Sequence, residues 1–126
     1  MKKASDLTDD ELSRVIAESF EPPSHFVNTC RDSEHGWWRR RYLNGWIVEP
    51  RSFSEPEIVV RLLKWLLTQP DWQCVIGDEW PRPLIEIEMT PTEDGWKSGK
   101  RGFCLQSSNI ERVIAEAVAI AKGAAE

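Results

Sequence analysis

The sequence contains few of the residues on which several kinds of catalytic and metal chemistry depend. It has two histidines and three cysteines in 126 residues, and the cysteines Cys30, Cys74 and Cys104 lie far apart. An odd number of scattered cysteines is typical of a reducing compartment, in which thiols stay unpaired. A disulfide framework is therefore disfavoured. A nucleophile activated by histidine is disfavoured as well, because His25 and His35 both fall in a turn-rich acidic segment.

Metal-ligand spacing is also lacking. His25, Cys30 and His35 follow one another at five-residue intervals, but no C-x-x-C or H-x-x-x-H pair accompanies them. We expect loop histidines and a buried thiol here rather than a metal site. The glycines Gly95 and Gly99 lack the spacing of a phosphate-binding loop, so no cofactor is predicted.

No long hydrophobic run is present. The longest apolar stretch, around residues 58–67, is broken by Arg61 and Lys64, so no segment is expected to span a membrane. Lys2 and Lys3 lead into acidic residues rather than into the apolar core of a signal peptide. These features predict a cytoplasmic protein.

Charge is negative overall but unevenly distributed. The formal net charge is -5, whereas residues 37–51 hold four arginines against one glutamate. A net negative chain is repelled by nucleic acids and anionic lipids, so neither non-specific nucleic acid nor a membrane is an expected partner. The compact basic segment remains able to bind an anion locally.

Three segments have the apolar periodicity of amphipathic helices, and each opens with the pattern of a capping box. The expected N-caps and their reciprocal glutamates are Thr8 with Glu11, Ser54 with Glu57, and Ser108 with Glu111. Prolines at positions 22, 23 and 70 end the first two helices, and Gly123 is placed to end the third.

Strand patterns lie between these helices. Residues 38–49 form a predicted hairpin around Asn44-Gly45, a strong signal for a two-residue turn that pairs Leu43 with Trp46 and Arg40 with Glu49. Further strands are predicted over residues 72–76, 84–89 and 102–106, and an exposed hairpin loop over 90–100. In the second of these strands, Ile85, Ile87 and Met89 alternate with Glu86 and Glu88.

The predicted fold class is therefore α+β. We expect a single domain over residues 1–126, with an antiparallel sheet of about five short strands. With three helices, the element order is α-β-β-α-β-β-β-α. No βαβ unit with a glycine-rich turn is present, which disfavours a parallel nucleotide-binding sheet.

Tryptophan is abundant, with seven residues where a chain of this size ordinarily has about two. Trp37, Trp38 and Trp46 lie in or beside the same hairpin as Arg39 and Arg41. The expected register places Trp37, Arg39 and Arg41 on one face with Trp46, and Trp38 on the other.

Two interpretations of this tryptophan and arginine pattern remain open. Arginine side chains can cover aromatic rings on a half-buried sheet, or the hairpin can present a recognition surface. Trp80, in an acidic and proline-rich loop, is either a cover over the core or an exposed anchor. The candidate binding residues are Trp37, Trp38, Arg39, Arg41 and Trp80.

Glu86 and Glu88 are the one carboxylate pair with spacing that suits a cation or acid–base catalysis. Carboxylates at alternate strand positions more often form a solvated face, which is the interpretation we favour. No catalytic residue is assigned, and an enzyme is not expected.

The order of these elements resembles a known family. A capped helix, a tryptophan-rich hairpin, a second helix and an alanine-rich last helix carry the resemblance in Leu12–Glu18, Trp46–Pro50, Phe53–Ser54, Trp65–Leu67 and Ile110–Ala117. The pattern is similar to that of the phage ABA sandwich domain family, which phages and prophages encode. The resemblance implies a layered α-β-α sandwich and no established catalytic residues.

These observations lead to three hypotheses on function. The first is a non-enzymatic phage or prophage accessory protein in the bacterial cytoplasm, which binds a host protein or a small host ligand through the tryptophan and arginine hairpin. The second is a module that uses the same hairpin to sequester a nucleotide or a signalling molecule, with a small phosphorylated ligand as the expected partner. The third is a small hydrolase using Glu86 and Glu88. An exposed tryptophan face also favours a homodimer.

Overall fold

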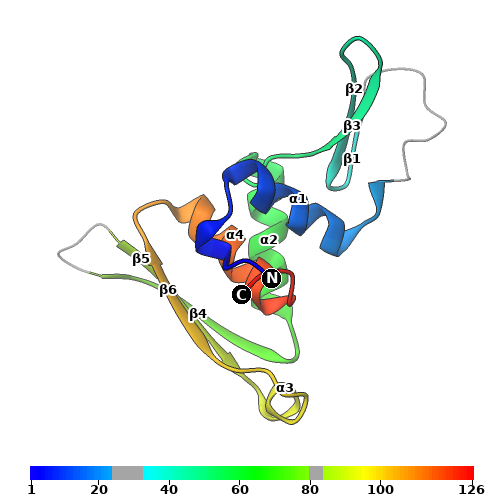
Figure 1. Cartoon of the computed structure of the whole chain (residues 1–126). Coiled ribbons are helices and arrows are strands. Elements are labelled where there is room, and N and C mark those ends of the chain that lie inside the picture. Colours follow the sequence, from blue (N-terminus) through cyan, green and yellow to red (C-terminus); the bar gives the residue numbers. More distant parts are fainter. Residues whose placement is uncertain (24–32, 80–83) are drawn as a thin grey trace.

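The computed structural model describes residues 1–23, 33–79 and 84–126. Within these ranges the chain forms four α-helices, a short 3₁₀ helix and six strands in two antiparallel sheets of three strands each (Figure 1). The α+β class and the predicted element order are confirmed. A short first strand and a short third helix are additions to that order.

The three predicted helices are present as α1 (Asp9–Phe20), α2 (Pro56–Thr68) and α4 (Ile110–Ala121), and the 3₁₀ helix η1 covers Ala4–Asp6. The capping box of α1 is confirmed. Thr8 Oγ1 accepts from the Glu11 backbone N–H at 3.1 Å, and Glu11 Oε1 accepts from the Thr8 N–H at 3.1 Å.

The other two capping predictions are wrong by one residue. Glu55 is the N-cap of α2 because Pro56 occupies the first helical turn, and no side chain caps this helix end. The Glu55 carboxylate instead accepts from the Ser52 N–H at 3.0 Å. Asn109, rather than the predicted Ser108, caps α4. Its Oδ1 accepts from the Arg112 N–H at 3.1 Å, the kind of bond to the third helical residue that was expected of Ser108.

The C-terminal end of α4 closes as predicted at Gly123, which has a φ of 74°. The Gly123 N–H donates to Ile120 O at 3.0 Å, and the Ala124 N–H donates to Ala119 O at 2.9 Å. These two bonds form a Schellman motif, which satisfies carbonyl groups that the helix itself leaves open.

The larger sheet consists of β4 (Trp72–Glu79), β5 (Leu84–Pro91) and β6 (Phe103–Ser107) in that order. The predicted alternation in β5 is confirmed, since Ile87 and Met89 are buried and Glu88 is exposed. The predicted exposed loop over 90–100 is wrong in part, because α3 (Glu93–Lys97) forms inside it.

Helix α3 packs closely against the residues that lead into β4. A Cβ atom at Gly95 would overlap the carbonyl oxygen of Asp71. That same oxygen accepts from the Thr92 N–H at 3.0 Å, and Thr92 Oγ1 donates to Pro70 O at 2.9 Å. Only glycine permits this close approach, so the position of α3 is fixed by the backbone of the β4 entry.

The smaller sheet consists of β1 (Ser33–His35), β2 (Trp38–Tyr42) and β3 (Trp46–Pro50). The hairpin of β2 and β3 is confirmed, but its predicted register is wrong by one residue. Tyr42 pairs with Trp46, and Arg39 rather than Arg40 lies opposite Glu49.

The cause of this shift is a three-residue turn. Asn44 has a φ of 55° and Gly45 a φ of 140°, and the Leu43 N–H donates to Gly45 O at 2.8 Å. Three-residue loops with a left-handed residue are the next most common hairpin type after the two-residue turn. A change of one residue in one strand moves its side chains to the other face, so Trp46 shares a face with Trp38 rather than with Trp37.

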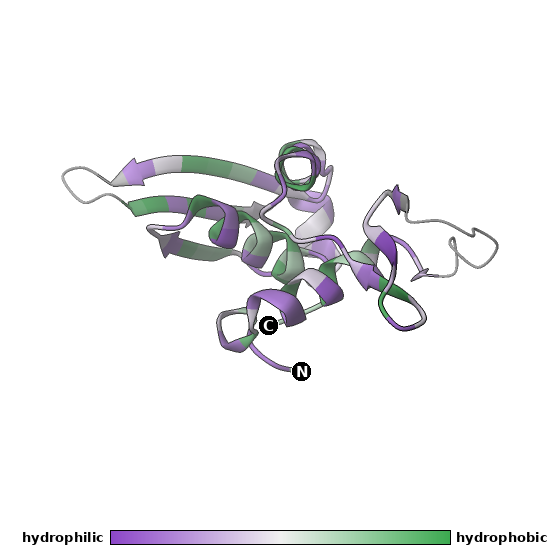
Figure 2. Cartoon of the chain, turned by 90° about the horizontal axis from the view of Figure 1, so that it is seen from above, coloured by the Kyte–Doolittle hydropathy of each residue, from purple (hydrophilic) through white to green (hydrophobic). Residues whose placement is uncertain are grey.

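The layers differ from the expected α-β-α sandwich with a single sheet. The helices lie between the two sheets, with β4–β6 on one side and β1–β3 on the other (Figures 1 and 2). The face of the larger sheet that points away from the helices carries exposed residues, among them Gln73, Val75, Glu88, Cys104 and Gln106. No described helix covers that face.

The main core lies where α1, α2 and α4 meet each other and the inner face of β4–β6. Figure 2 shows hydrophobic segments along these strands and along the helices beside them. Fully buried core side chains come from every one of these helices and from the central strand, among them Leu12, Ile16, Leu62, Leu66, Ile87, Met89, Val113 and Val118. The described part of the chain has no helix of the length and apolarity that crossing a membrane requires.

We expect the substitution Leu62→Ala to lower the free energy of unfolding by about 2–5 kcal/mol, because it opens a cavity in this core. Leu67 provides the matched control, since it lies on the same helix but is 59% exposed. Leu67→Ala should change the stability by less than about 0.5 kcal/mol. Urea denaturation of both variants measures the difference, and equal losses would contradict the assigned core face of α2.

Candidate functional site

Trp38 anchors the base of the β2–β3 hairpin in the protein interior. Its side chain is 0% exposed, and its Nε1–H donates to the backbone oxygen of Glu21 at 2.8 Å. Arg14 lies over the ring at 5.9 Å. The expectation that Trp38 faces outward is therefore wrong, because the indole packs under the end of α1.

Trp37 makes a second internal contact at the hairpin base. Its ring stacks on Phe20 with centroids 4.1 Å apart and an interplanar angle of 11°. The guanidinium of Arg61 lies 5.8 Å from the Trp37 ring centroid. Trp37 is half-buried and is held between α1 and α2.

The two candidate arginines are engaged by acidic neighbours. Arg39 Nε donates to Glu34 Oε1 at 2.8 Å, and its Nη2 lies 3.2 Å from Glu55 Oε1. Arg41 Nε lies 2.6 Å from Glu49 Oε1, an ion pair without the geometry of a hydrogen bond. Both side chains thus make local ion pairs, which corresponds to the packing interpretation of the pattern.

Arg51, which is not among the predicted binding residues, joins the hairpin to the helices. Only 6% of the Arg51 side chain is exposed, and its Nη1 donates to Gly36 O at 3.1 Å. Its Nη2 donates to Glu57 Oε2 at 2.8 Å and to Glu55 Oε1 at 3.3 Å, and lies 3.7 Å from Glu34 Oε2. We refer to these four side chains (Arg51, Glu34, Glu55 and Glu57) as the Arg51 cluster.

The charges in the Arg51 cluster stabilise one another. Burial alone would lower the pKa of Arg51, but the hydrogen bond to Glu57 and the charges of Glu55, Glu57 and Glu34 outweigh it, so the pKa is raised. The bonds from Arg51, followed by the charge of Arg61, lower the pKa of Glu57. Both shifts favour the charged forms of Arg51 and Glu57.

The far end of the hairpin, in contrast, carries exposed apolar side chains. Tyr42 is 60% exposed, Leu43 56% and Trp46 43%, and we call these three residues the hairpin tip. The Tyr42 and Trp46 rings meet edge to face at 5.3 Å. The Arg40 guanidinium lies 4.4 Å from the Trp46 ring centroid. The tip projects away from the helical body in Figure 1.

None of the three tip residues is among the binding residues predicted from the sequence. Tyr42 and Leu43 lie beside the predicted turn rather than among the arginines, and Trp46 is predicted only to share a face with them. The available signal was Asn44-Gly45 itself, since large apolar residues next to a tight hairpin turn cannot reach a core.

The carboxylate pair lies on the outer face of the larger sheet. Glu86 accepts from Cys104 Sγ at 3.3 Å and from Gln106 Nε2 at 3.1 Å, whereas Glu88 is exposed. A small loss of hydration, followed by the hydrogen bond and charge of Glu86 and the charge of Glu88, raises the pKa of the exposed Cys104 thiol. A raised pKa keeps the thiol protonated, so this group is not an activated nucleophile.

Other candidates fall where the structure gives no description. Trp80, His25 and Cys30 lie outside the described residues, and only the backbone of His35 is described, as the last residue of β1. Within the described ranges, no group of three or more histidine, cysteine, aspartate or glutamate side chains is arranged so that it could hold a metal ion.

Comparison with known proteins adds no assignment to this geometry. No family model matches the chain, and no curated protein and no solved structure matches it either.

We expect Arg51→Met to lower the free energy of unfolding by about 2 kcal/mol, because it removes charge-assisted hydrogen bonds from a buried position. Arg41→Met is the matched control, since the Arg41 side chain is 42% exposed and its pair with Glu49 is worth less than about 1 kcal/mol. Urea denaturation measures both. If the two variants lose equal stability, the Arg51 cluster does not hold the hairpin.

We also expect stability to fall when the pH drops below 4.5, the ordinary pKa of Glu57. The folded state lowers this pKa, so the stabilisation is present above the unfolded pKa and is lost as the pH falls through the folded value. Glu57→Gln should flatten this dependence, because the variant has no proton to take up. Unfolding free energies at a series of pH values test this, and an unchanged slope in the variant would contradict the assigned role of Glu57.

Proposed function

We propose that this chain is a binding protein that recognises another protein through the hairpin tip. The observation that carries the proposal is the exposure of three neighbouring large side chains, Tyr42, Leu43 and Trp46, at the end of a projecting hairpin. Tryptophan and tyrosine are the residue types that most often dominate the binding energy of protein interfaces.

The firm attachment of the hairpin base supports this proposal. Trp38 is buried beneath α1, Trp37 stacks on Phe20, and the Arg51 cluster joins the hairpin to the start of α2. A binding element that is already fixed in place loses little conformational freedom when its partner binds. The tip thus has the rigid support that a small aromatic contact needs for useful affinity.

The chemistry of the tip points to an apolar pocket on the partner. The aromatic pair presents an apolar edge, and the Arg40 guanidinium lies over the Trp46 ring. Arg40 itself is buried, with 9% of its surface exposed, so the apolar edge rather than its charge is available to the partner.

The resemblance of the sequence to phage ABA sandwich proteins gives the proposal its biological setting. In that setting the chain is a non-enzymatic accessory protein of a phage or prophage, it acts in the bacterial cytoplasm, and the partner is a host protein. The hydrolase alternative has less support, because Glu88 is exposed and Glu86 is engaged by Cys104 and Gln106.

The test compares tip variants with matched surface variants in binding to bacterial host proteins. We expect Trp46→Ser and Leu43→Ser to weaken capture of the same host protein by about ten-fold or more, because each removes an apolar anchor. Trp96→Ser and Leu67→Ser are the controls, since these residues are 70% and 59% exposed but lie away from the hairpin. Quantitative capture on the immobilised full chain, with thermal unfolding of each variant, gives the readout.

Two results would overturn the proposal. One is recovery of the same proteins in the same amounts by the tip variants and the wild type. The other is concentration-dependent sedimentation of the purified chain that Trp46→Ser abolishes, which would assign the tip to a homodimer contact instead.

A further inference from the structure

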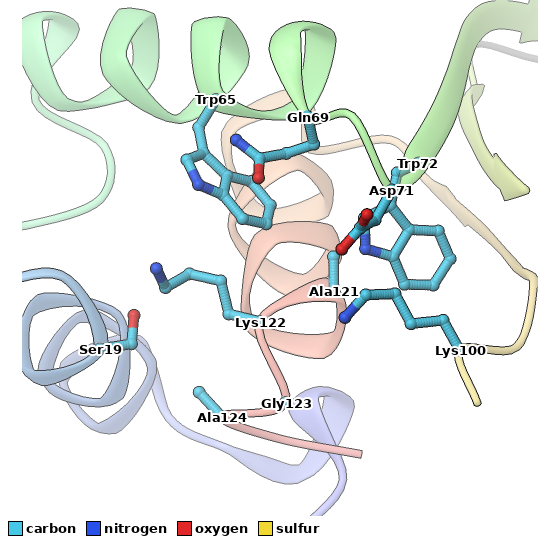
Figure 3. Close-up of a pocket in the computed structure, with 10 residues that line it drawn as sticks. All are labelled: Ser19, Trp65, Gln69, Asp71, Trp72, Lys100, Ala121, Lys122, Gly123 and Ala124. Atoms are coloured by element: carbon cyan, nitrogen blue, oxygen red, sulfur yellow. The ribbon is translucent and has the colours of Figure 1, made fainter. Parts of the chain in front are cut away.

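A cavity of about 470 Å³ lies on the opposite side of the molecule's helical body from the hairpin tip, where the C-terminal ends of α2 and α4 meet the beginning of β4 (Figures 1 and 3). None of the candidate residues from the sequence lines it. Its walls combine two indole rings with polar and charged side chains, namely Trp65, Gln69, Asp71, Trp72, Lys100 and Lys122. A volume in this range is typical of sites for small molecules.

Lys122 is the most unusual group in the cavity. Its Nζ lies 3.7 Å from the Phe20 ring centroid and 5.2 Å from that of Trp65, and the side chain is half-buried. Burial lowers the pKa of Lys122, which means that the protein does not fully replace the water its charge has lost. The aromatic rings compensate only part of that loss.

No described carboxylate forms an ion pair with Lys122. Among the residues that the structure describes, the lysines found in ion pairs are Lys2 and Lys97, and neither Lys122 nor Lys100 has such a partner. Lys100 Nζ lies 5.9 Å from the Trp72 ring centroid, on the other side of the cavity (Figure 3). The two lysines thus line the same cavity from different elements, with their ammonium groups directed to different parts of it.

The positive character continues beyond Lys100. This residue also lines a second hollow of about 500 Å³, together with Trp96, Gly99 and Arg101. Of the residues that line the two hollows, three are basic and one, Asp71, is acidic. A local basic surface with aromatic rings stands out on a chain whose net charge is -5.

A simpler explanation accounts for part of this arrangement. Lys122 is the C-cap of α4, where a positive charge interacts favourably with the helix dipole. The carbonyl groups there are already satisfied by Gly123 and Ala124 in the Schellman motif, however. The dipole also does not explain why Trp65, Trp72 and Lys100 surround the same space.

We propose that this cavity binds a small anion carrying a planar ring, of the chemistry of a nucleoside monophosphate. The ring packs against the Trp65 indole, and the positive charge that Lys122 and Lys100 give to the cavity holds the anionic group. A long polyanion is disfavoured because the whole chain repels it. A bare inorganic anion fills too little of the cavity, and a neutral ring leaves both ammonium groups without a counter-charge.

The test measures binding of defined probes to the full chain. Adenosine, guanosine, cytidine and uridine monophosphates are titrated by calorimetry and by thermal unfolding, beside the free nucleosides and inorganic phosphate. At least one monophosphate should raise the unfolding temperature in a saturable way, because a ligand that binds only the folded state stabilises it. The corresponding nucleoside and inorganic phosphate should give smaller shifts.

Variants then locate the site. Lys122→Met and Lys100→Met should each weaken binding about ten-fold or more, because each removes a charge-assisted contact. Lys97→Met is the control, since Lys97 is exposed and paired with Glu93 outside the cavity. The two test positions lie on different elements, so a folding defect in one variant leaves the other as the test.

Three outcomes would overturn the proposal. These are the absence of any saturable shift with the four monophosphates, unchanged affinity in both cavity variants, and equal shifts with inorganic phosphate and the monophosphates. None of them bears on protein binding at the hairpin tip, which shares no residue with the cavity.

Discussion

The buried guanidinium of Arg51 is the interaction on which the arrangement of the hairpin and the helices depends. An arginine taken from water requires several partners, and Arg51 obtains them from Gly36, Glu34, Glu55 and Glu57, which belong to different segments of the chain. The electrostatic requirement of one side chain thus sets where β1, the turn before β2 and the start of α2 lie. Trp38 packs with Ala17 of α1, and Trp37 packs against this pair and against the main core.

The sequence predicted those elements whose determinants are local. The apolar periodicities of α1, α2 and α4, the alternation in β5 and the glycine after α4 each depend on a few neighbouring residues, and they are confirmed. The predicted N-caps of α2 and α4 are wrong by one residue, because two polar residues lie side by side at the start of each helix. The hairpin register failed because Asn44-Gly45 is compatible with both a two-residue and a three-residue turn.

The sites depend on contacts that no local pattern encodes. The buried Trp38 indole packs on Ala17 and donates to the backbone oxygen of Glu21, 17 positions away. The prediction of one sheet instead of two is wrong because no strand's sequence states which partner strand it takes. The cavity is assembled from the end of α2, the entry of β4, the segment before β6 and the end of α4. From the sequence alone Lys122 is an ordinary lysine at the end of a helix, because its contacts with the Phe20 and Trp65 rings come from other helices.

The glycine contact between α3 and the entry of β4 has a consequence for any molecule that enters the hollow lined by Trp96 and Lys100. Because Gly95 lies directly on the Asp71 carbonyl and Thr92 is bonded to both Asp71 and Pro70, α3 cannot move away from the strand without breaking these contacts. The side of that hollow which α3 forms therefore does not act as a closing lid. A ligand there would be selected by its fit to a preformed shape, and it should enter and leave without a movement of α3.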